Sequence, residues 1–451
     1  MLTTSRTTST SFWQVLYPWI IVMGGMLFYC YNYFLRTSPS VMQTELVNAF
    51  HINAYQFGAL AAFYYYAYTA MQIPAGMIYD KFGVRFVLSS ACLLATCGLA
   101  VFINANDFLV AGIGRFMIGL GCAFAYIGIL KLASVWLPTN RFATIAGLSN
   151  AVGMASGALA QNYLTPTVAL IGYKAALHSA VMVGVGLCCF MVLLLRNKPK
   201  SALYPTIEPH QPMNLRQLSH ALWLICRNPQ MWIIGLIGCL FYLPSSVFQD
   251  LWGIPYLKNV YHLTGTQAAA TSSYLFYGWI ISGPVIGMLS DKIRRRRLPI
   301  MICGIAAIAL WCLVFYTSHL SLSSLPLIFF AIGFSCGAQP LCFALGKENN
   351  PVQISATSVA ITNMLIMLGG VIFQPVVGAL LDMHANNAGN LINHYTPSDY
   401  TFALSVLPIG VAVGVVLSFF LKETYCESQV AEERPVFKGT PVLTVVEKAT
   451  L

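Results

Sequence analysis

Two short stretches of the chain decide the fold: GMIYDKFGVR at residues 76–85 and GMLSDKIRRR at residues 287–296. Their glycines, at positions 76 and 287, and their aspartates, at 80 and 291, are both separated by 211 residues. Each stretch follows the second long apolar run of its half of the chain. The sequence therefore predicts a unit of six helices that is used twice. Repeated halves of this kind are typical of secondary transporters.

The composition indicates a membrane protein. Of 451 residues, 57% are hydrophobic and 8% are charged, whereas a soluble protein carries about 25% charged residues. High apolar content also excludes a disordered or fibrous chain. The 13 cysteines lie in apolar runs without the spacing of a metal or redox motif, so we expect neither a metal nor a cofactor. No glycine-rich phosphate loop occurs, and no cluster of titratable residues favours an enzyme.

Twelve runs are long and apolar enough to cross a bilayer, whose core of about 30 Å needs about 20 helical residues. The predicted spans are 15–38, 54–78, 84–104, 108–131, 142–164, 173–195, 230–252, 267–289, 298–318, 322–346, 353–381 and 400–421. The predicted fold class is an all-α membrane protein with twelve transmembrane helices in two pseudo-symmetric six-helix bundles. The predicted domains are a tail (1–14), a first bundle (15–195), a proline-containing linker (196–229), a second bundle (230–421) and a second tail (422–451).

The placement of Lys and Arg predicts the orientation. With the N-terminus inside, 20 of the 24 Lys and Arg residues fall in inside segments. The outside loops then hold only Lys174 and Lys258, while Arg36 and Arg115 lie within spans. Both termini are therefore predicted to be cytoplasmic. The net charge of +10 is explained by this topology, so we expect no nucleic acid partner.

The stretch at 76–85 resembles the loop signature of the major facilitator superfamily, Gly-x-x-x-Asp-(Arg/Lys)-x-Gly-x-(Arg/Lys). The second copy differs in having Arg294 in place of the second glycine, and Arg115-x-x-x-Gly119-x-Gly121 is similar to another motif of the family. The resemblance covers about residues 15 to 421. It implies a latch that locks the cytoplasmic side of the outward-open state, formed by Gly76, Asp80, Lys81, Gly83, Arg85, Gly287, Asp291 and Lys292. The basic residues of these loops also have a simpler interpretation as topology signals.

The position of Asp80 at a helix end gives it a specific expected partner. A carboxylate is stabilised by the partial positive charge at a helix N-terminus. We therefore expect Asp80 to accept hydrogen bonds from the N-terminus of a neighbouring helix.

A stretch of the first span, residues 32–42 with the sequence NYFLRTSPSVM, is similar to the signature of the anion:cation symporter branch of this family. That branch includes carriers of sialic acid and galactonate. The chain departs from it at Leu35, where the branch usually has an acidic residue. The sequence is also similar to the lysosomal dipeptide carrier group. These resemblances imply a substrate that is a small organic anion, an amino acid or a peptide.

Few ionisable groups lie within the predicted spans, where a charge costs roughly 2.5–3.5 kcal/mol and therefore indicates function. Asp250 lies near the outer end of the seventh span, and the 211-residue repeat places Gln249 and Asp250 close to the position related to Arg36. We expect the substrate to bind Arg36, Tyr33, Tyr65, Gln249 and Asn363, and proton coupling to involve Asp250 and Arg115. In the alternative, Arg36 snorkels to the headgroups, and Arg36 and Asp250 sit uncoupled at a wet outer rim.

The predicted function is secondary active transport of a small organic anion, amino acid or peptide by alternating access, with H⁺ as the coupling ion and with the protein acting as a monomer. One alternative is a carrier of a larger ligand such as a siderophore. Another is a non-transporting receptor or sensor, which the lack of a sizeable soluble output domain disfavours. The sequence has no Asn-x-Ser/Thr sequon, which fits a bacterial inner membrane.

Overall fold

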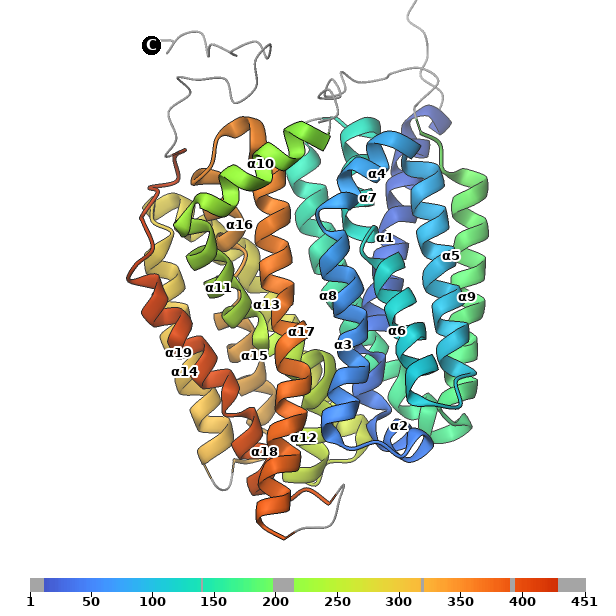
Figure 1. Cartoon of the computed structure of the whole chain (residues 1–451), viewed down its shortest axis with the longest axis vertical. Coiled ribbons are helices and arrows are strands. Elements are labelled where there is room, and N and C mark those ends of the chain that lie inside the picture. The colour runs from blue at the N-terminus through green and yellow to red at the C-terminus, as the bar shows by residue number, and fades with distance from the viewer. Residues whose placement is uncertain (1–11, 139–140, 198–214, 318–319, 390–393, 429–451) are drawn as a thin grey trace, which may run out of the picture.

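The computed structural model describes residues 12–138, 141–197, 215–317, 320–389 and 394–428, which form helices joined by short loops, with no strand among them (Figure 1). The first bundle contains α1 (Phe12–Val41), α2 (Gln43–Phe50), α3 (Ala54–Met71), α4 (Pro74–Phe82), α5 (Val84–Ile103), α6 (Phe108–Cys122), α7 (Ala125–Trp136), α8 (Phe142–Ile171) and α9 (Tyr173–Leu194). After α10 (Leu215–Arg227), the second bundle contains α11 (Pro229–Leu243), the π-helix η2 (Pro244–Trp252), α12 (Gly253–Val260), α13 (Gly265–Ile293), α14 (Arg297–Tyr316), α15 (Leu325–Cys336), α16 (Leu341–Glu348), the short 3₁₀-helix η3 (Val352–Ile354), α17 (Ser355–Asn387), α18 (Pro397–Leu404) and α19 (Val406–Ser418).

These helices form twelve membrane spans. Nine segments of the described chain are long and apolar enough to cross a membrane by length and composition. The three others contain α3, α8 and α13, which carry more polar residues and pack against the other bundle. The predicted fold class, with twelve helices in two six-helix bundles, is therefore confirmed.

Several predicted spans are not single helices. Spans 54–78, 108–131 and 322–346 each consist of two helices, with breaks at residues 72–73, 123–124 and 337–340, and span 400–421 is divided at Ser405. Pro74 and Pro340 stand at two of these breaks. A proline lacks the N–H that would continue the helix and restricts the residue before it. The apolar runs continue through the breaks, which is why hydropathy predicted one helix in each case.

The predicted linker 196–229 contains a helix that its composition did not indicate. Helix α10 buries Leu218, Ala221 and Ile225 and exposes Leu215 and Trp223, so it is amphipathic. It lies across the ends of α11 and α17 (Figure 1). Residues 198–214 of the linker, and residues 1–11 and 429–451 of the predicted tails, lie outside the described residues, and the domain bounds stay predictions.

The two bundles meet through two pairs of long helices, α3 with α17 and α8 with α13, and through α1 with η2 (Figure 1). Backbones approach closely in the first pair: a Cβ added to Gly58 would lie 2.3 Å from the Gln374 carbonyl oxygen, and one added to Gly378 would lie 2.1 Å from that of Ala54. Glycine permits this approach because it has no Cβ. We call the end of the molecule with α4, α10 and the Arg294–Arg297 loop the basic end, and the other end the opposite end.

Candidate functional site

An ion pair joins Arg36 of α1 to Asp250 of η2, where the two bundles meet. Arg36 Nε and Nη2 both lie 2.6 Å from Asp250 Oδ2. Arg36 is 4% exposed and Asp250 is 1% exposed, so water is excluded from the pair. The 211-residue repeat predicted related positions for Arg36 and Asp250, with the alternative that both lie at a wet outer rim without interacting. The structure brings them into direct contact.

Three tyrosines surround the Arg36 guanidinium. Its central carbon lies 5.2 Å from the ring centres of Tyr33 and Tyr65 and 5.5 Å from that of Tyr242, within the range of cation–π attraction. Arg36 Nη2 also donates to the Tyr242 hydroxyl at 2.7 Å, and the Tyr65 hydroxyl donates to Asp250. A buried ion pair loses the hydration of both charges and needs additional hydrogen bonds to compensate. The tyrosines provide that compensation.

The pair leaves two polar atoms without partners. Asp250 Oδ1 is buried and accepts no hydrogen bond, because Arg36 Nε, Arg36 Nη2 and the Tyr65 hydroxyl all converge on Oδ2. Within the described part of the chain, Arg36 Nη1 makes no hydrogen bond. Buried polar atoms are nearly always satisfied. The site therefore offers Asp250 Oδ1 as an acceptor for a proton and Arg36 Nη1 as a donor to a bound ligand.

The π-helical geometry of η2 presents Asp250 to this site. All nine residues of η2 are buried, and Pro244 begins the element. Proline lacks a backbone N–H, so the regular α-helical bonding of α11 cannot continue through it. π-helical turns are rare and often occur at functional sites. The prediction of a regular helix over 230–252 is thus corrected, since hydropathy does not distinguish the two helix types.

Gln249, which stays a predicted substrate residue, bonds to a glutamine of the other bundle. Gln249 Nε2 donates to Gln161 Oε1 at 3.0 Å, and Gln161 Nε2 donates to the Gln249 carbonyl at 2.7 Å. Ser272 Oγ donates to Gln249 Oε1 at 2.8 Å, and Gln161 Nε2 approaches Ser40 Oγ at 3.2 Å. We call Ser40, Gln161, Gln249 and Ser272 the amide bar. Because Ser40 lies one helical turn beyond Arg36, the bar connects the bundles on the opposite-end side of the ion pair.

Asn363 and Arg115 also lie apart from the ion pair. Asn363 Nδ2 donates to Gln72 Oε1 at 2.7 Å, which joins the bundles nearer the basic end. Arg115 Nη1 donates to the Leu35 carbonyl at 2.8 Å, and its guanidinium carbon lies 5.4 Å from the ring centre of Tyr64. Among the described residues, no carboxylate forms an ion pair with Arg115. Arg115 therefore supports the backbone beside Arg36 and does not contact Asp250.

In the first bundle, the predicted latch residues bond to their own bundle. Asp80 Oδ1 accepts from Lys131 Nζ of α7 at 2.6 Å, so a lysine takes the place of the expected helix N-terminus. The Arg85 N–H donates to Asn197 Oδ1 at 2.9 Å, and its guanidinium donates to a backbone carbonyl of α9. Gly83 has φ +79°, a left-handed conformation that favours glycine.

In the second bundle, the latch residues are also engaged locally. Asp291 Oδ1 accepts from Arg296 Nη1 at 2.6 Å, and Glu348 accepts from Arg296 Nη2 at 2.7 Å. Burial alone would lower the pKa of Arg296, but its hydrogen bonds to Glu348 and Asp291 raise it above its ordinary value. The remaining predicted latch residues are exposed or border open space: Lys81, Lys292, Gly76 and Gly287. None of the latch contacts described for either bundle crosses to the other one.

The contact expected of Asp80 occurs at the opposite end, with a different aspartate. Asp382 of α17 accepts hydrogen bonds from the backbone N–H groups of Ala54 and Tyr55, at 3.3 and 2.9 Å. These residues begin α3, so a carboxylate of the second bundle caps a helix N-terminus of the first. Nearby, Asn162 Nδ2 of α8 donates to Ser273 Oγ of α13 at 2.7 Å. The two bundles are thus joined at the opposite end.

Three residues of these sites were missed in the sequence: Tyr242, Gln161 and Asp382. Gln161 is a polar residue near the end of the fifth predicted span, whereas Asn363 lies further inside its own span. Asp382 follows directly on the predicted span 353–381, and its position there resembles that of Asp80 after 54–78. No sequence signal pointed to Tyr242, because its contact with Arg36 depends on how the two bundles dock.

Comparisons with known proteins agree with this architecture. The family model of the Major Facilitator Superfamily matches residues 22–374. The choline/ethanolamine transporter FLVCR2 of Homo sapiens is 22% identical, over 90% of this chain and 77% of its own length. The probable L-galactonate transporter of Escherichia coli (strain K12) is 22% identical, over 86% of each chain.

A solved structure shares the fold. It is a bacterial homolog of the human lysosomal transporter Spinster, described as inward-facing and unoccupied, with a TM-score of 0.69 and 16% identity over 91% of this chain and 96% of that chain. The family match covers most of the chain, and the relatives named above are transporters rather than enzymes. The chain therefore belongs to the Major Facilitator Superfamily and is a membrane transporter.

Proposed function

We propose that the protein is a secondary active transporter that moves a small organic anion, or a zwitterion such as an amino acid or peptide, together with H⁺. The observation that carries this proposal is the buried Arg36–Asp250 ion pair, in which Asp250 Oδ1 is buried without a donor and Arg36 bonds through Nε and Nη2 but not through Nη1. An ionisable pair inside a membrane is expensive and is retained where it binds a substrate or a proton.

The unused donor defines how the substrate binds. A guanidinium can hold a carboxylate through two parallel hydrogen bonds. Arg36 Nη1 is free and Nη2 is shared between Asp250 and Tyr242, so a substrate carboxylate can engage both nitrogens by displacing Asp250 from Nη2. The rings of Tyr33 and Tyr65 then border the bound group. The Escherichia coli relative, named a probable L-galactonate transporter, fits a substrate with a carboxylate.

The unused acceptor defines how a proton is coupled. When the substrate carboxylate takes Nη1 and Nη2, Asp250 keeps only Arg36 Nε and shares the cation with a second carboxylate. In a site from which water is excluded, this sharing favours uptake of a proton by Asp250. Substrate binding thus promotes proton binding. Linkage requires that the proton promotes substrate binding by the same factor.

The contacts at the two ends fit an alternating-access cycle. The amide bar and the Asp382 cap hold the bundles together at the opposite end, while the latch residues at the basic end bond within their own bundles. We take this as the state in which the basic end is unlatched. In the other state, Asp80 would leave Lys131 and bond across the bundle interface, and the Asp382 cap would open.

The tyrosine cage suggests a second candidate, an organic cation such as choline. Aromatic cages bind quaternary ammonium groups, and FLVCR2 is named a choline/ethanolamine transporter. In this structure the cage already encloses the Arg36 guanidinium. A cationic substrate would have to move the Arg36 guanidinium out of the cage and would then bind beside this like charge. Repulsion between the two cations therefore disfavours a cationic substrate relative to an anion.

Transport into proteoliposomes tests the proposal. Labelled carboxylates, amino acids, dipeptides and choline would be presented with and without an inward proton gradient. We expect accumulation of one or more carboxylate-bearing solutes that the gradient accelerates. Accumulation of choline alone would establish the second candidate.

The orientation gives a separate prediction. We propose that the basic end faces the cytoplasm of a bacterium whose inner membrane holds the protein as a monomer. Alkaline phosphatase is active only in the periplasm, so its fusion to the C-terminus is expected to be inactive, whereas a fusion in the loop after α12 is expected to be active. The reverse pattern would contradict the orientation.

The two aspartates at opposite ends should have opposite effects on the conformational equilibrium. Removing a helix cap costs about 1 kcal/mol, so Asp382→Ala should shift the equilibrium about fivefold away from the state described here. Hydrogen–deuterium exchange is expected to rise at the start of α3. Asp80→Ala should instead reduce the uptake rate without raising exchange there and without loss of folding. Wild-type uptake by well-folded Asp80→Ala protein would exclude the latch role.

A further inference from the structure

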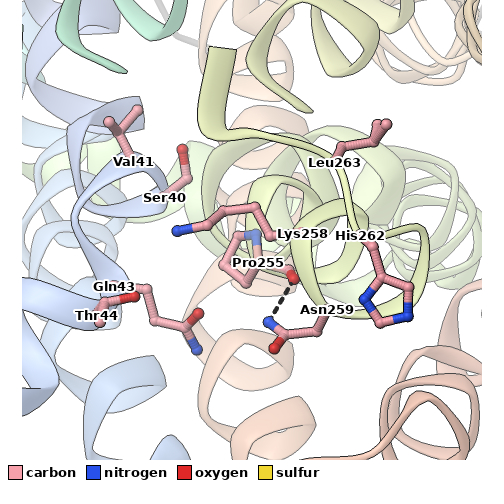
Figure 2. A pocket seen from close by; sticks show the side chains of 9 residues that line it. All are labelled: Ser40, Val41, Gln43, Thr44, Pro255, Lys258, Asn259, His262 and Leu263. Atoms are coloured by element: carbon pink, nitrogen blue, oxygen red, sulfur yellow. Dashed lines mark hydrogen bonds between the residues drawn. The ribbon is translucent and has the colours of Figure 1, made fainter. Parts of the chain in front are cut away.

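A polar pocket of about 210 Å³ lies at the opposite end, outside the amide bar (Figure 2). It is lined by Ser40 and Val41 of α1, Gln43 and Thr44 of α2, Pro255, Lys258 and Asn259 of α12, and His262 and Leu263. The walls come from both bundles. Ser40 is shared with the amide bar, so the bar separates this pocket from the Arg36 site. The pocket has room for several waters or a small organic molecule, since one water occupies about 30 Å³.

The charged residue among those that line this pocket is Lys258. Lys258 is exposed and extends across the pocket toward α1, and His262 borders the same space (Figure 2). The side chains of Lys258 and His262 make no hydrogen bond or ion pair with the described residues. No carboxylate lines the pocket. Glu45 follows the lining residue Thr44 in the first turn of α2 and is not itself among the lining residues.

Among the neutral lining residues, Thr44 offers a hydroxyl donor to a ligand. The Ser40 hydroxyl already donates to the Thr37 carbonyl at 2.8 Å, and the Asn259 amide donates to the Pro255 carbonyl at 2.8 Å and to the Tyr400 hydroxyl at 3.2 Å. Gln43 and Thr44 open the eight-residue helix α2, whose N-terminus has no side-chain cap. An uncapped helix N-terminus carries partial positive charge and favours anions. Glu45 in the same first turn offsets part of that charge, so Lys258, which extends toward α1 and α2 across the pocket, is the main source of positive charge (Figure 2).

We infer that this pocket is a second, peripheral binding site for a small oxyanion, either a carboxylate or a phosphate group. Lys258 supplies the positive charge, and the first turn of α2 supplies donors. The site is separate from the Arg36 site and does not depend on the substrate proposed for it. Its ligand can be a free solute or a lipid headgroup, because both present the same oxyanion.

Chemical labelling of lysines distinguishes these cases in the full-length protein. Lys258 and Lys174 are the two lysines assigned to the opposite end, so Lys174 serves as an internal control. Nanodiscs of phosphatidylcholine would be treated with an amine-reactive reagent in the presence of phosphate or succinate, and the labelling rate at each lysine read by peptide mass spectrometry. At an anion concentration about four times the dissociation constant, labelling of Lys258 should slow about fivefold, with Lys174 unchanged.

Variants test whether anion binding in this pocket causes the slower labelling of Lys258. Thr44→Asp places a carboxylate in the pocket and should abolish protection of Lys258, whereas Thr44→Asn should retain it. Protection should persist in Asp250→Asn, because that substitution affects only the proposed transport site. Protection in phosphatidylglycerol nanodiscs without added anion, and none by soluble anions, would identify a lipid headgroup as the ligand. Unchanged labelling of Lys258 in all conditions, or equal protection of Lys174, would overturn the proposal.

Discussion

Asp250→Asn is expected to abolish the acceleration of uptake by an inward proton gradient while leaving exchange of substrate across the membrane intact. Asparagine has nearly the shape of aspartate and can still accept the hydrogen bond of Tyr65, but it cannot bind a proton in exchange for Arg36. With no titratable partner, substrate binding and proton binding become independent. The measurement compares gradient-driven accumulation with counterflow exchange in proteoliposomes of the same protein preparation.

Asp107→Asn is the matched control for this variant. Asp107 caps α6 through a hydrogen bond from the Val110 N–H, and asparagine caps a helix about as well as aspartate. The control therefore removes the same charge from the protein without touching the ion pair. If gradient-driven accumulation survives in Asp250→Asn, Asp250 does not carry the coupling proton.

Arg36→Ala is expected to lower both transport and stability. Truncating one partner of a buried, hydrogen-bonded charge pair costs about 2–5 kcal/mol, which corresponds to a loss of substrate affinity from about 30-fold to several thousand-fold. The free energy of unfolding should also fall, because Asp250 and the Tyr242 hydroxyl lose their partner. Substrate binding and thermal unfolding in detergent would measure the two losses separately.

Two further variants separate binding from stability. Arg36→Lys keeps the charge but loses the planar fork, so it should retain stability better than affinity. A double variant, Arg36→Met with Asp250→Leu, replaces the ion pair by apolar side chains, which often restores stability. It should fold and should not transport. A double variant that transports at the wild-type rate would exclude the ion pair from the substrate site.

The sequence predicted the parts of the structure that depend on composition and repetition. Twelve spans and two bundles follow from hydropathy and from the 211-residue offset, and the rarity of charge inside the membrane singled out Arg36 and Asp250. Their direct contact could not be predicted, because a repeat relates positions without fixing the distance between them. The same limit explains why Gln249, a neighbour of Asp250 in sequence, points to Gln161 and not to Arg36.

The partners of the aspartates show a second limit. Asp80 has the position expected of a helix-capping residue, yet it bonds to Lys131, while Asp382 makes the capping contact at the other end. One sequence must encode both states of an alternating-access cycle, and a motif does not say which state a structure presents. Local features such as the breaks at Pro74 and Pro340 were likewise hidden by continuous hydropathy.

The π-helix η2 ties the chemistry of the site to the length of the chain. In a regular helix, each residue advances the side-chain direction by about 100°. Loss of a single residue from 244–249 is expected to rotate Asp250 by about 100° relative to α11, away from Arg36. A one-residue insertion or deletion here can therefore make or remove the ion pair without any substitution. Among homologous carriers, the number of residues in this segment is therefore expected to decide whether a carboxylate faces the arginine at the substrate site.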